Sequence, residues 1–287
     1  VYHNYLALIQ AELAKVERDK KQKAKLLEDA VESAENCIKL CLRSGTLSQG
    51  QHATLGGYYS DFGGILDQLY VMTGSSELLR KLLEVYKGAV ETYEKADLPS
   101  RAAQSYWQQA KVHDKLGNLA ESAESFESAH DQYVMAATKI PSLKSFYLNH
   151  ASYMKGWREI QKARQHHVMR KYDRAKKYYE KAASLHKASK FWKYLVSNYL
   201  AWAQLESGED LSRREQPQKA RGIFQRAAEL FAEAKKSIET RLESITQREE
   251  KEMATELVRA SRIRREYCLA RIALEEAKIL DRKGEYI

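Results

Sequence analysis

The sequence carries one helical signature four times: a small residue, an aromatic residue four positions later, and an alanine three positions after that. Spacings of four and three place the three side chains on one face of an α-helix. The small residue allows a neighbouring helix to approach closely, and the ring fills the space beside it. This pattern predicts a chain of helices that each pack on the next, as in a solenoid. The signature recurs at Ala89, Tyr93 and Ala96, at Ser122, Phe126 and Ala129, at Ala175, Tyr179 and Ala182, and at Ala220, Phe224 and Ala227.

The composition favours an all-α chain. Only 3 prolines and 13 glycines interrupt 287 residues, and proline costs roughly 3 kcal/mol inside a helix. We therefore expect essentially no sheet. No apolar run approaches the roughly 20 residues that span a bilayer, and no signal peptide opens the chain, so we expect no membrane insertion.

Three cysteines are too few and too unevenly placed for a disulfide framework. This predicts a reducing, cytoplasmic setting. Cys37 and Cys41 lie one helical turn apart, but no second pair of ligands follows at a metal-binding spacing. We interpret them as small buried residues and predict neither a metal site nor a cofactor.

Seven glycines lie between residues 45 and 74. A phosphate-binding loop is excluded because no Gly-Lys-Ser/Thr sequence follows and no strand precedes. Gly56 and Gly63 are seven residues apart and share a helical face. The spacing predicts a glycine-notched helix in close contact with a neighbour.

The best-formed unit runs from residue 100 to 140. One helix is expected from Arg101 to Leu116, Gly117 and Asn118 form the turn, and the partner helix runs from Leu119 to about Lys139. This segment resembles a tetratricopeptide repeat, a helix-turn-helix unit that stacks into a right-handed superhelix. The residues that match the family pattern are Tyr106, Ala110, Gly117, Asn118, Leu119, Ser122, Phe126 and Ala129.

Two further segments match less closely. In the first, Arg170 stands where the family often has glycine; in the second, an insertion is expected around residues 208–216. The signature alanines are 33, 53 and 45 residues apart, so the array is expected to be irregular, with longer helices. The matching residues are Ala163, Tyr172, Asp173, Ala175, Tyr179 and Ala182 in the first, and Ala203, Ala220, Phe224 and Ala227 in the second.

The resemblance implies one right-handed α-solenoid of antiparallel helix hairpins over residues 1–287, with about 10–12 helices. It divides into N-terminal helices (1–97), the best-formed repeat (100–140), longer irregular repeats (141–247) and a last incomplete repeat (250–287). Gly284, Glu285 and Tyr286 follow Ala277 as a repeat turn would, which predicts a fragment of a longer protein. An apolar face around Leu274 and Ala277 is expected to be available for pairing with a second copy. These two belong to the apolar stripe expected along the last helix: Ile263, Tyr267, Ala270, Leu274, Ala277 and Leu280.

The resemblance also implies a concave groove lined by the first helix of each repeat. A cationic, partly aromatic groove suits a protein or an acidic or C-terminal peptide, because ammonium and guanidinium groups pair with carboxylates. Chaperone-tail clamps of the family have lysine and asparagine where Trp107 and Lys111 stand, which argues against that ligand. The groove positions are Trp107, Lys111 and Asp114, then Ile160, Arg164 and His167, and finally Leu274, Lys278 and Asp281.

No catalytic motif is present, so we expect a non-enzymatic interaction scaffold. The net charge is +9, and nine Lys or Arg residues lie between residues 155 and 177 against Glu159 and Asp173. The alternative is a solenoid that binds single-stranded RNA through this basic, aromatic-rich surface over residues 155–193. The aromatic residues in question are Tyr147, Tyr153, Trp157, Tyr172, Tyr178, Tyr179, Trp192 and Tyr194.

Overall fold

The computed structural model describes residues 1–43, 45–246 and 248–284. In these ranges the chain forms eleven α-helices, two short 3₁₀ helices and no strand, which confirms the prediction of an all-α fold of consecutively packed helices. The chain divides into two compact units, residues 1–154 and 155–287. The expectation of one continuous array over residues 1–287 remains a prediction.

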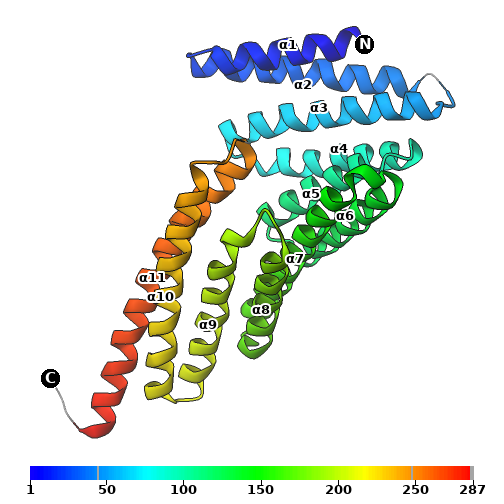
Figure 1. The fold of residues 1–287 in the computed structure, drawn as a ribbon. Coiled ribbons are helices and arrows are strands. Elements are labelled where there is room, and N and C mark those ends of the chain that lie inside the picture. The colour runs from blue at the N-terminus through cyan, green and yellow to red at the C-terminus, as the bar shows by residue number, and fades with distance from the viewer. Residues whose placement is uncertain (44, 247, 285–287) are drawn as a thin grey trace. The chain divides into compact units, whose positions relative to one another are not determined.

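In the first unit each helix packs against the next one along the chain, from α1 to α6, and α1 also contacts α3 (Figure 1). Leucine, isoleucine, alanine and aromatic side chains of α1 to α5 form its largest core cluster. The helices are α1 (Tyr2–Val16), α2 (Lys20–Leu42), α3 (Gln49–Thr73), α4 (Ser76–Lys95), α5 (Pro99–Lys115) and α6 (Leu119–Lys139), followed by η1 (Pro141–Leu143).

The unit boundary falls within α7 (Lys144–Val168). In the second unit α8 packs on α9, α9 on α10 and α10 on α11, with a smaller contact between α9 and α11. The long helices α10 and α11 lie side by side (Figure 1). The remaining elements are α8 (Tyr172–Ala188), η2 (Lys193–Leu195), α9 (Val196–Arg213), α10 (Pro217–Leu242) and α11 (Arg248–Lys283).

The small-aromatic-alanine signature forms the helix contacts that its spacing predicts. All twelve signature residues are buried, and none is more than 5% exposed. The ring of Phe224 on α10 lies against Gly208 of α9, where an added Cβ would come within 2.7 Å of it. Gly208 therefore belongs to a continuous helix, and the extra residues expected around 208–216 lengthen α9, which runs on to Arg213 before a short turn.

The glycine-notched helix is confirmed. Tyr93 and Tyr86 of α4 fill the notches at Gly56 and Gly63 of α3, where an added Cβ would lie 2.6 and 2.5 Å from the rings. The contact is reciprocal, because Tyr59 of α3 lies equally close to a glycine on α4. The two helices thus interlock by ring and notch, which fixes their register.

Four hairpin turns share one geometry. In each, the residue two positions before the next helix has a left-handed φ angle. This angle is 57° at Asp97, 79° at Gly117, 53° at Arg170 and 56° at Glu215. The amide of the following residue donates a hydrogen bond to a carbonyl five residues back in each case, as from Asn118 to His113 at 2.9 Å. Such a bond satisfies a carbonyl that the end of the helix leaves without a partner. The predicted turn at residues 117–118 is confirmed, and the turn at Arg170 has the same form without a glycine.

The two longest helices are consecutive: α10 ends at Leu242 and α11 begins at Arg248. Past α11, Gly284 has a φ of 71° and its amide donates to the carbonyl of Asp281. Glu285 and Tyr286, the rest of the expected repeat turn, lie outside the described residues.

The notch at Gly63 gives a direct test of helix interlock. Replacing Gly63 with alanine drives a methyl group into the Tyr86 ring, and we expect a loss of about 1–3 kcal/mol in the free energy of unfolding. The neighbouring Gly64 has open space where its Cβ would be, so Gly64→Ala gains helix propensity of up to about 1 kcal/mol. Urea unfolding of the two variants measures the contrast. Equal changes in the free energy of unfolding for the two variants would show that the contact at Gly63 does not hold α3 and α4 together.

Candidate interaction surfaces

The predicted groove residues of α5 form one half-buried face of the first unit. Trp107 packs edge-on against Tyr153, with ring centroids 6.0 Å apart, and the Lys111 ammonium lies 5.3 Å from the centre of the Trp107 ring. Asp114 follows one turn later and is also half-buried. The face therefore presents an aromatic ring that is packed against a second ring, a cation above it and a carboxylate one helical turn further along.

Lys115 extends this face to α3. Its ammonium lies 4.6 Å from the centre of the Tyr70 ring and donates to Oδ1 of Asp67 at 3.0 Å. Two successive lysines on α5 thus lie each above an aromatic ring, an arrangement that attracts the cation to the negative face of the ring. We call Trp107, Lys111, Lys115 and Tyr70 the lysine-aromatic face.

The predicted residues of α7 belong to the second unit, and their contacts run within it. His167 Nδ1 lies 2.8 Å from Oε1 of Glu206 on α9, and Arg164 donates to Gln161 at 3.0 Å on its own helix. The hydrogen bond with Glu206 raises the pKa of His167, and burial raises the pKa of Glu206. Ile160 is 4% exposed, so its expected place in the groove is wrong: its apolar side chain is part of the core.

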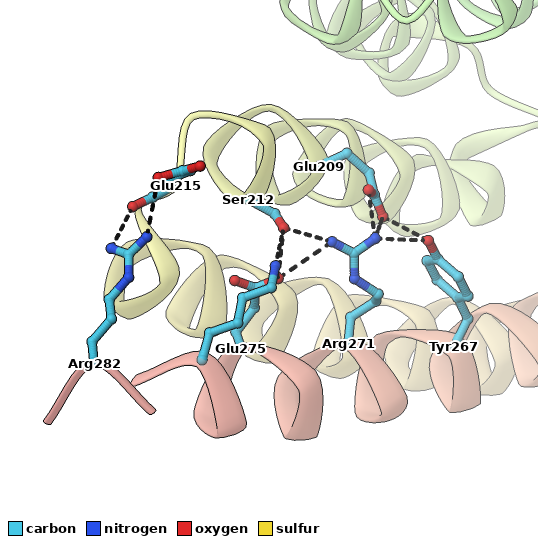
Figure 2. A network of polar contacts seen from close by, with 8 residues as sticks. Glu209, Ser212, Glu215, Tyr267, Arg271, Glu275 and Arg282 are labelled. Carbon is cyan, nitrogen blue, oxygen red and sulfur yellow. Dashed lines mark hydrogen bonds and ion pairs between the residues drawn. The ribbon is translucent and has the colours of Figure 1, made fainter. Parts of the chain in front are cut away.

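Lys278 takes part in a polar network between α9 and α11. Its ammonium donates to Glu275 at 2.8 Å and to Ser212 at 3.1 Å. At the centre of the network, the Arg271 guanidinium donates to both carboxylate oxygens of Glu209, at 2.7 and 2.6 Å, and to Ser212 at 2.8 Å (Figure 2). Lys278 thus helps to hold two helices together.

Arg271 is enclosed by rings as well as carboxylates. Its guanidinium carbon lies 4.8 Å from the centre of the Phe224 ring and 5.9 Å from that of Tyr267, whose hydroxyl donates to Glu209 at 2.7 Å. The Arg271 side chain is 17% exposed, and that of Glu209 is 11% exposed. A charge pair this far from water depends on both partners being present.

Buried carboxylates distinguish the second unit from the first. Glu159, Glu206, Glu209 and Glu275 are buried in the second unit, whereas the buried polar residues of the first are serines, a threonine and an asparagine. Glu159 forms an ion pair with Lys181, with 3.1 Å between Oε2 and Nζ. No group of three or more His, Cys, Asp or Glu side chains arranged for a metal ion occurs among the described residues. Lys, Arg and His side chains contact these four carboxylates.

The aromatic residues of the basic stretch are mostly core residues. Of the eight that the RNA-binding alternative relies on, five are buried and so closed to base stacking. Several basic side chains of the same stretch stay exposed, including Arg170, Lys171, Arg174 and Lys177. This region thus offers charge without an open stacking platform. The five buried residues are Tyr147, Tyr153, Tyr179, Trp192 and Tyr194.

The apolar stripe expected on the last helix lies on its open side. Ile263 is 52% and Leu274 48% exposed, and Ala270 and Ala277 are exposed too. The pairing of this face with a second copy remains a prediction. The residues that α11 buries follow a spacing of seven instead: Ala254, Ser261, Cys268 and Glu275.

The structure divides the predicted site residues between the two units. Trp107, Lys111 and Asp114 share one face of α5 in the first unit. Arg164, His167 and Lys278 lie in the second, where Arg164 contacts its own helix and the other two contact a neighbouring helix. Sequence reasoning missed Arg271 as the centre of the α9–α11 contact. The sequence did contain one relevant pattern on the same helix: small and polar residues recur every seven positions, at Ala254, Ser261, Cys268 and Glu275.

None of the three cysteines forms a disulfide; all are free thiols. Cys37 and Cys268 are buried and Cys41 is partly buried, in agreement with their interpretation as small core residues. Burial raises the pKa of the Cys37 thiol and raises that of Cys268 to about 12. These thiols are therefore protonated at neutral pH. In the described part of the chain, no helix combines the length and apolar character needed to cross a membrane.

Removing the Arg271 guanidinium should destabilise the second unit. Arg271→Met leaves Glu209 buried without its main cation, and we expect a loss of about 3 kcal/mol or more in the free energy of unfolding. Arg282→Met is the matched control on the same helix, because its partner Glu215 is exposed; its cost should stay below about 1 kcal/mol.

Adding Glu209→Gln to Arg271→Met should recover part of that stability, because the buried charge is then gone. Urea denaturation of the four proteins, including the parent, measures these differences. Equal losses for Arg271→Met and Arg282→Met would contradict the central place of Arg271.

Burial of His186 predicts a pH dependence of stability. The ring is fully buried, stacks on Tyr199 with centroids 5.2 Å apart, and lies against the notch at Gly156. Burial lowers its pKa from 6.5 to about 3. The unfolded chain therefore binds this proton below pH 6.5 while the folded chain does not, so the contribution is complete above pH 6.5 and is lost as pH falls toward 3.

Between pH 6.5 and 5 this single group should cost about 2 kcal/mol of stability. His186→Phe keeps a ring but cannot take up the proton, so its free energy of unfolding should fall less over that interval. Urea titrations at pH 7 and pH 5 compare the parent and the variant. An unchanged pH dependence in His186→Phe would assign the effect to other groups.

Comparisons with known proteins give structural likeness only. No family model matches the chain, and no curated protein matches it. Among solved structures, BtubC (BKLC) from P. vanneervenii is 14% identical, with 88% of this chain and 92% of that chain covered and a TM-score of 0.41. A circular tandem repeat protein is also 14% identical, with 96% and 72% covered and a TM-score of 0.28. A structure from the computational design of self-assembling cyclic homo-oligomers is 14% identical, with 96% and 94% covered and a TM-score of 0.22. Likenesses at this level assign neither a family nor a function.

Proposed function

We propose that the chain is a non-enzymatic, tetratricopeptide-like scaffold that binds an acidic peptide or an acidic segment of a partner protein. The observation that carries this proposal is the lysine-aromatic face of the first unit. Lys111 and Lys115 lie one turn apart on α5, and each ammonium is held above an aromatic ring. In the tetratricopeptide resemblance this side of α5 faces the concave groove.

Two features suit the face to an acidic ligand. The rings restrict the lysine side chains before the ligand arrives, so less conformational entropy is lost on binding. The exposed part of Trp107 offers an apolar contact beside the cations, and aromatic anchors of this kind dominate many interfaces. A ligand with carboxylates at helical or extended spacing next to an apolar side chain satisfies both features.

The second unit contributes less to the proposed site. His167 and Lys278 are bonded to buried glutamates, and Arg164 to a buried glutamine. Using any of them for a ligand would leave a buried partner without its hydrogen bond, whereas the Asp67 carboxylate that Lys115 contacts is 48% exposed and can be solvated by water. We therefore place the main binding residues at Trp107, Lys111 and Lys115, with Asp114 selecting against ligands that carry a carboxylate at its end of the face.

The proposal is tested with an array of short peptides of graded Asp and Glu content, probed with the full chain. We expect binding to rise with acidic content and to fall about tenfold or more in Lys111→Glu and in Trp107→Ala, because the first repels carboxylates and the second removes the anchor. Lys87→Glu on α4 is the matched control, since it makes the same charge change at an exposed position outside this face. Array binding that is equal in Lys111→Glu and Lys87→Glu would contradict the proposed site.

The nucleic-acid alternative is tested in parallel by fluorescence anisotropy of a labelled single-stranded RNA at low and moderate salt. Binding that weakens steeply with salt and is lost in Lys171→Glu, with Lys111→Glu unchanged, would move the function to the basic stretch. The peptide proposal expects no salt-sensitive RNA binding in the micromolar range.

A further inference from the structure

The first helix exposes a continuous apolar stripe. Along α1, Tyr2 is 73% exposed, Tyr5 64%, Ile9 57%, Leu13 50% and Val16 76%. At about 100° per residue these five side chains fall within about 40° of the Ile9 direction, so they form one narrow band along the whole helix. Large apolar side chains concentrated in this way mark an interaction site rather than ordinary surface.

The stripe is not the face by which α1 packs on the rest of its unit. The residues that α1 buries are Asn4, Ala7, Ala11 and Ala14, and they lie on the opposite side of the helix. Their small size allows close packing on α2, and Asn4 donates to Asp61 of α3 at 2.9 Å. The helix is therefore fully docked on its own unit while its larger apolar side chains point outward.

We propose that the stripe binds the same stripe of a second copy of the chain, with the two α1 helices antiparallel about a two-fold axis at Ile9. The spacing of the stripe is symmetric about that residue, at seven and four positions before it and four and seven positions after it. An antiparallel pair centred there sets Ile9 against Ile9, Tyr5 against Leu13 and Tyr2 against Val16. Each aromatic ring then meets an aliphatic side chain, as a self-complementary interface requires.

The charges on α1 permit this pairing. No Asp, Glu, Lys or Arg occurs from Val1 to Ala11. The acidic residue that flanks the stripe, Glu12, forms an ion pair with Lys15 on its own helix. Two stripes can therefore meet without placing an unbalanced charge against its own copy.

The area of the stripe sets the expected strength. Five side chains of this size and exposure present about 600 Å² per copy, or about 1,200 Å² in a pair, at the lower limit of specific interfaces. We therefore expect a dimer with micromolar affinity. The exposed stripe of α11 is a poorer candidate, because the charged residues Arg262 and Glu266 flank its apolar residues and the Tyr267 hydroxyl is already bonded to Glu209.

Sedimentation velocity of the full chain over the micromolar range tests the association. We expect a monomer-dimer equilibrium whose dissociation constant rises at least about tenfold in Ile9→Glu, because two carboxylates would then meet on the axis. Leu40→Glu on α2 is the matched control, since Leu40 is similarly exposed, and it should leave the equilibrium unchanged. Leu274→Glu should also leave it unchanged.

Disulfide cross-linking tests the orientation, and it does not depend on whether Ile9→Glu folds. Under mild oxidation Ile9→Cys should form a cross-linked dimer, because the two thiols meet at the axis. Tyr2→Cys should not, because its copies would be about 21 Å apart in the antiparallel pair. The parent chain, whose cysteines are buried or partly buried, sets the background.

Three results would each overturn the proposal: a monomer at tens of micromolar, a dimer lost in Leu274→Glu and kept in Ile9→Glu, or equal cross-linking of Tyr2→Cys and Ile9→Cys. The first removes the association, the second moves it to α11, and the third makes the pairing parallel.

Discussion

The close approach of consecutive helices at small residues is the constraint on which the rest of the structure depends. A helix satisfies its own backbone hydrogen bonds, so only its side-chain faces can hold it to a neighbour. Here the contact is made by alanine, serine or glycine on one helix and a ring beside it, as at Gly63 with Tyr86 and Gly208 with Phe224. Each helix buries its side chains against its neighbours alone, so a unit can grow by one helix after another. For the same reason, a helix that has only one neighbour can keep its other face exposed.

What the sequence predicted correctly is local. The signature residues, the notch at Gly63 and the turn at Gly117 depend on residues close in sequence, so spacing alone identifies them. The partner of Arg271 lies 62 residues away on α9, and no short-range pattern indicates it. The outward stripe of α11 was ambiguous for another reason: Ile263 and Leu274 have apolar periodicity, but Cys268 and its seven-residue series are the residues that the helix buries.

The buried charges of the second unit are best understood as determinants of register. A buried ion pair contributes little net stability over an apolar contact, because both charges must leave water. It does penalise misaligned packing, since a shift of one turn between α9 and α11 would separate Glu209 from its cation Arg271 and Glu275 from the Ser212 hydroxyl. The first unit achieves the same end with rings and notches. The second unit therefore adds an electrostatic determinant of register to the ring-and-notch contacts that both units contain.

The two proposed surfaces reinforce each other. The stripe of α1 and the lysine-aromatic face lie on different helices of the first unit, so a copy that pairs through α1 keeps Lys111 and Trp107 open. A dimer would then present two acidic-peptide sites, and a partner with two acidic segments could bind both. The second segment binds at the effective concentration that the first creates, so weak individual sites give a much tighter complex. Breaking the pair with Ile9→Glu should therefore weaken binding to a two-segment partner while leaving a single acidic peptide bound as before.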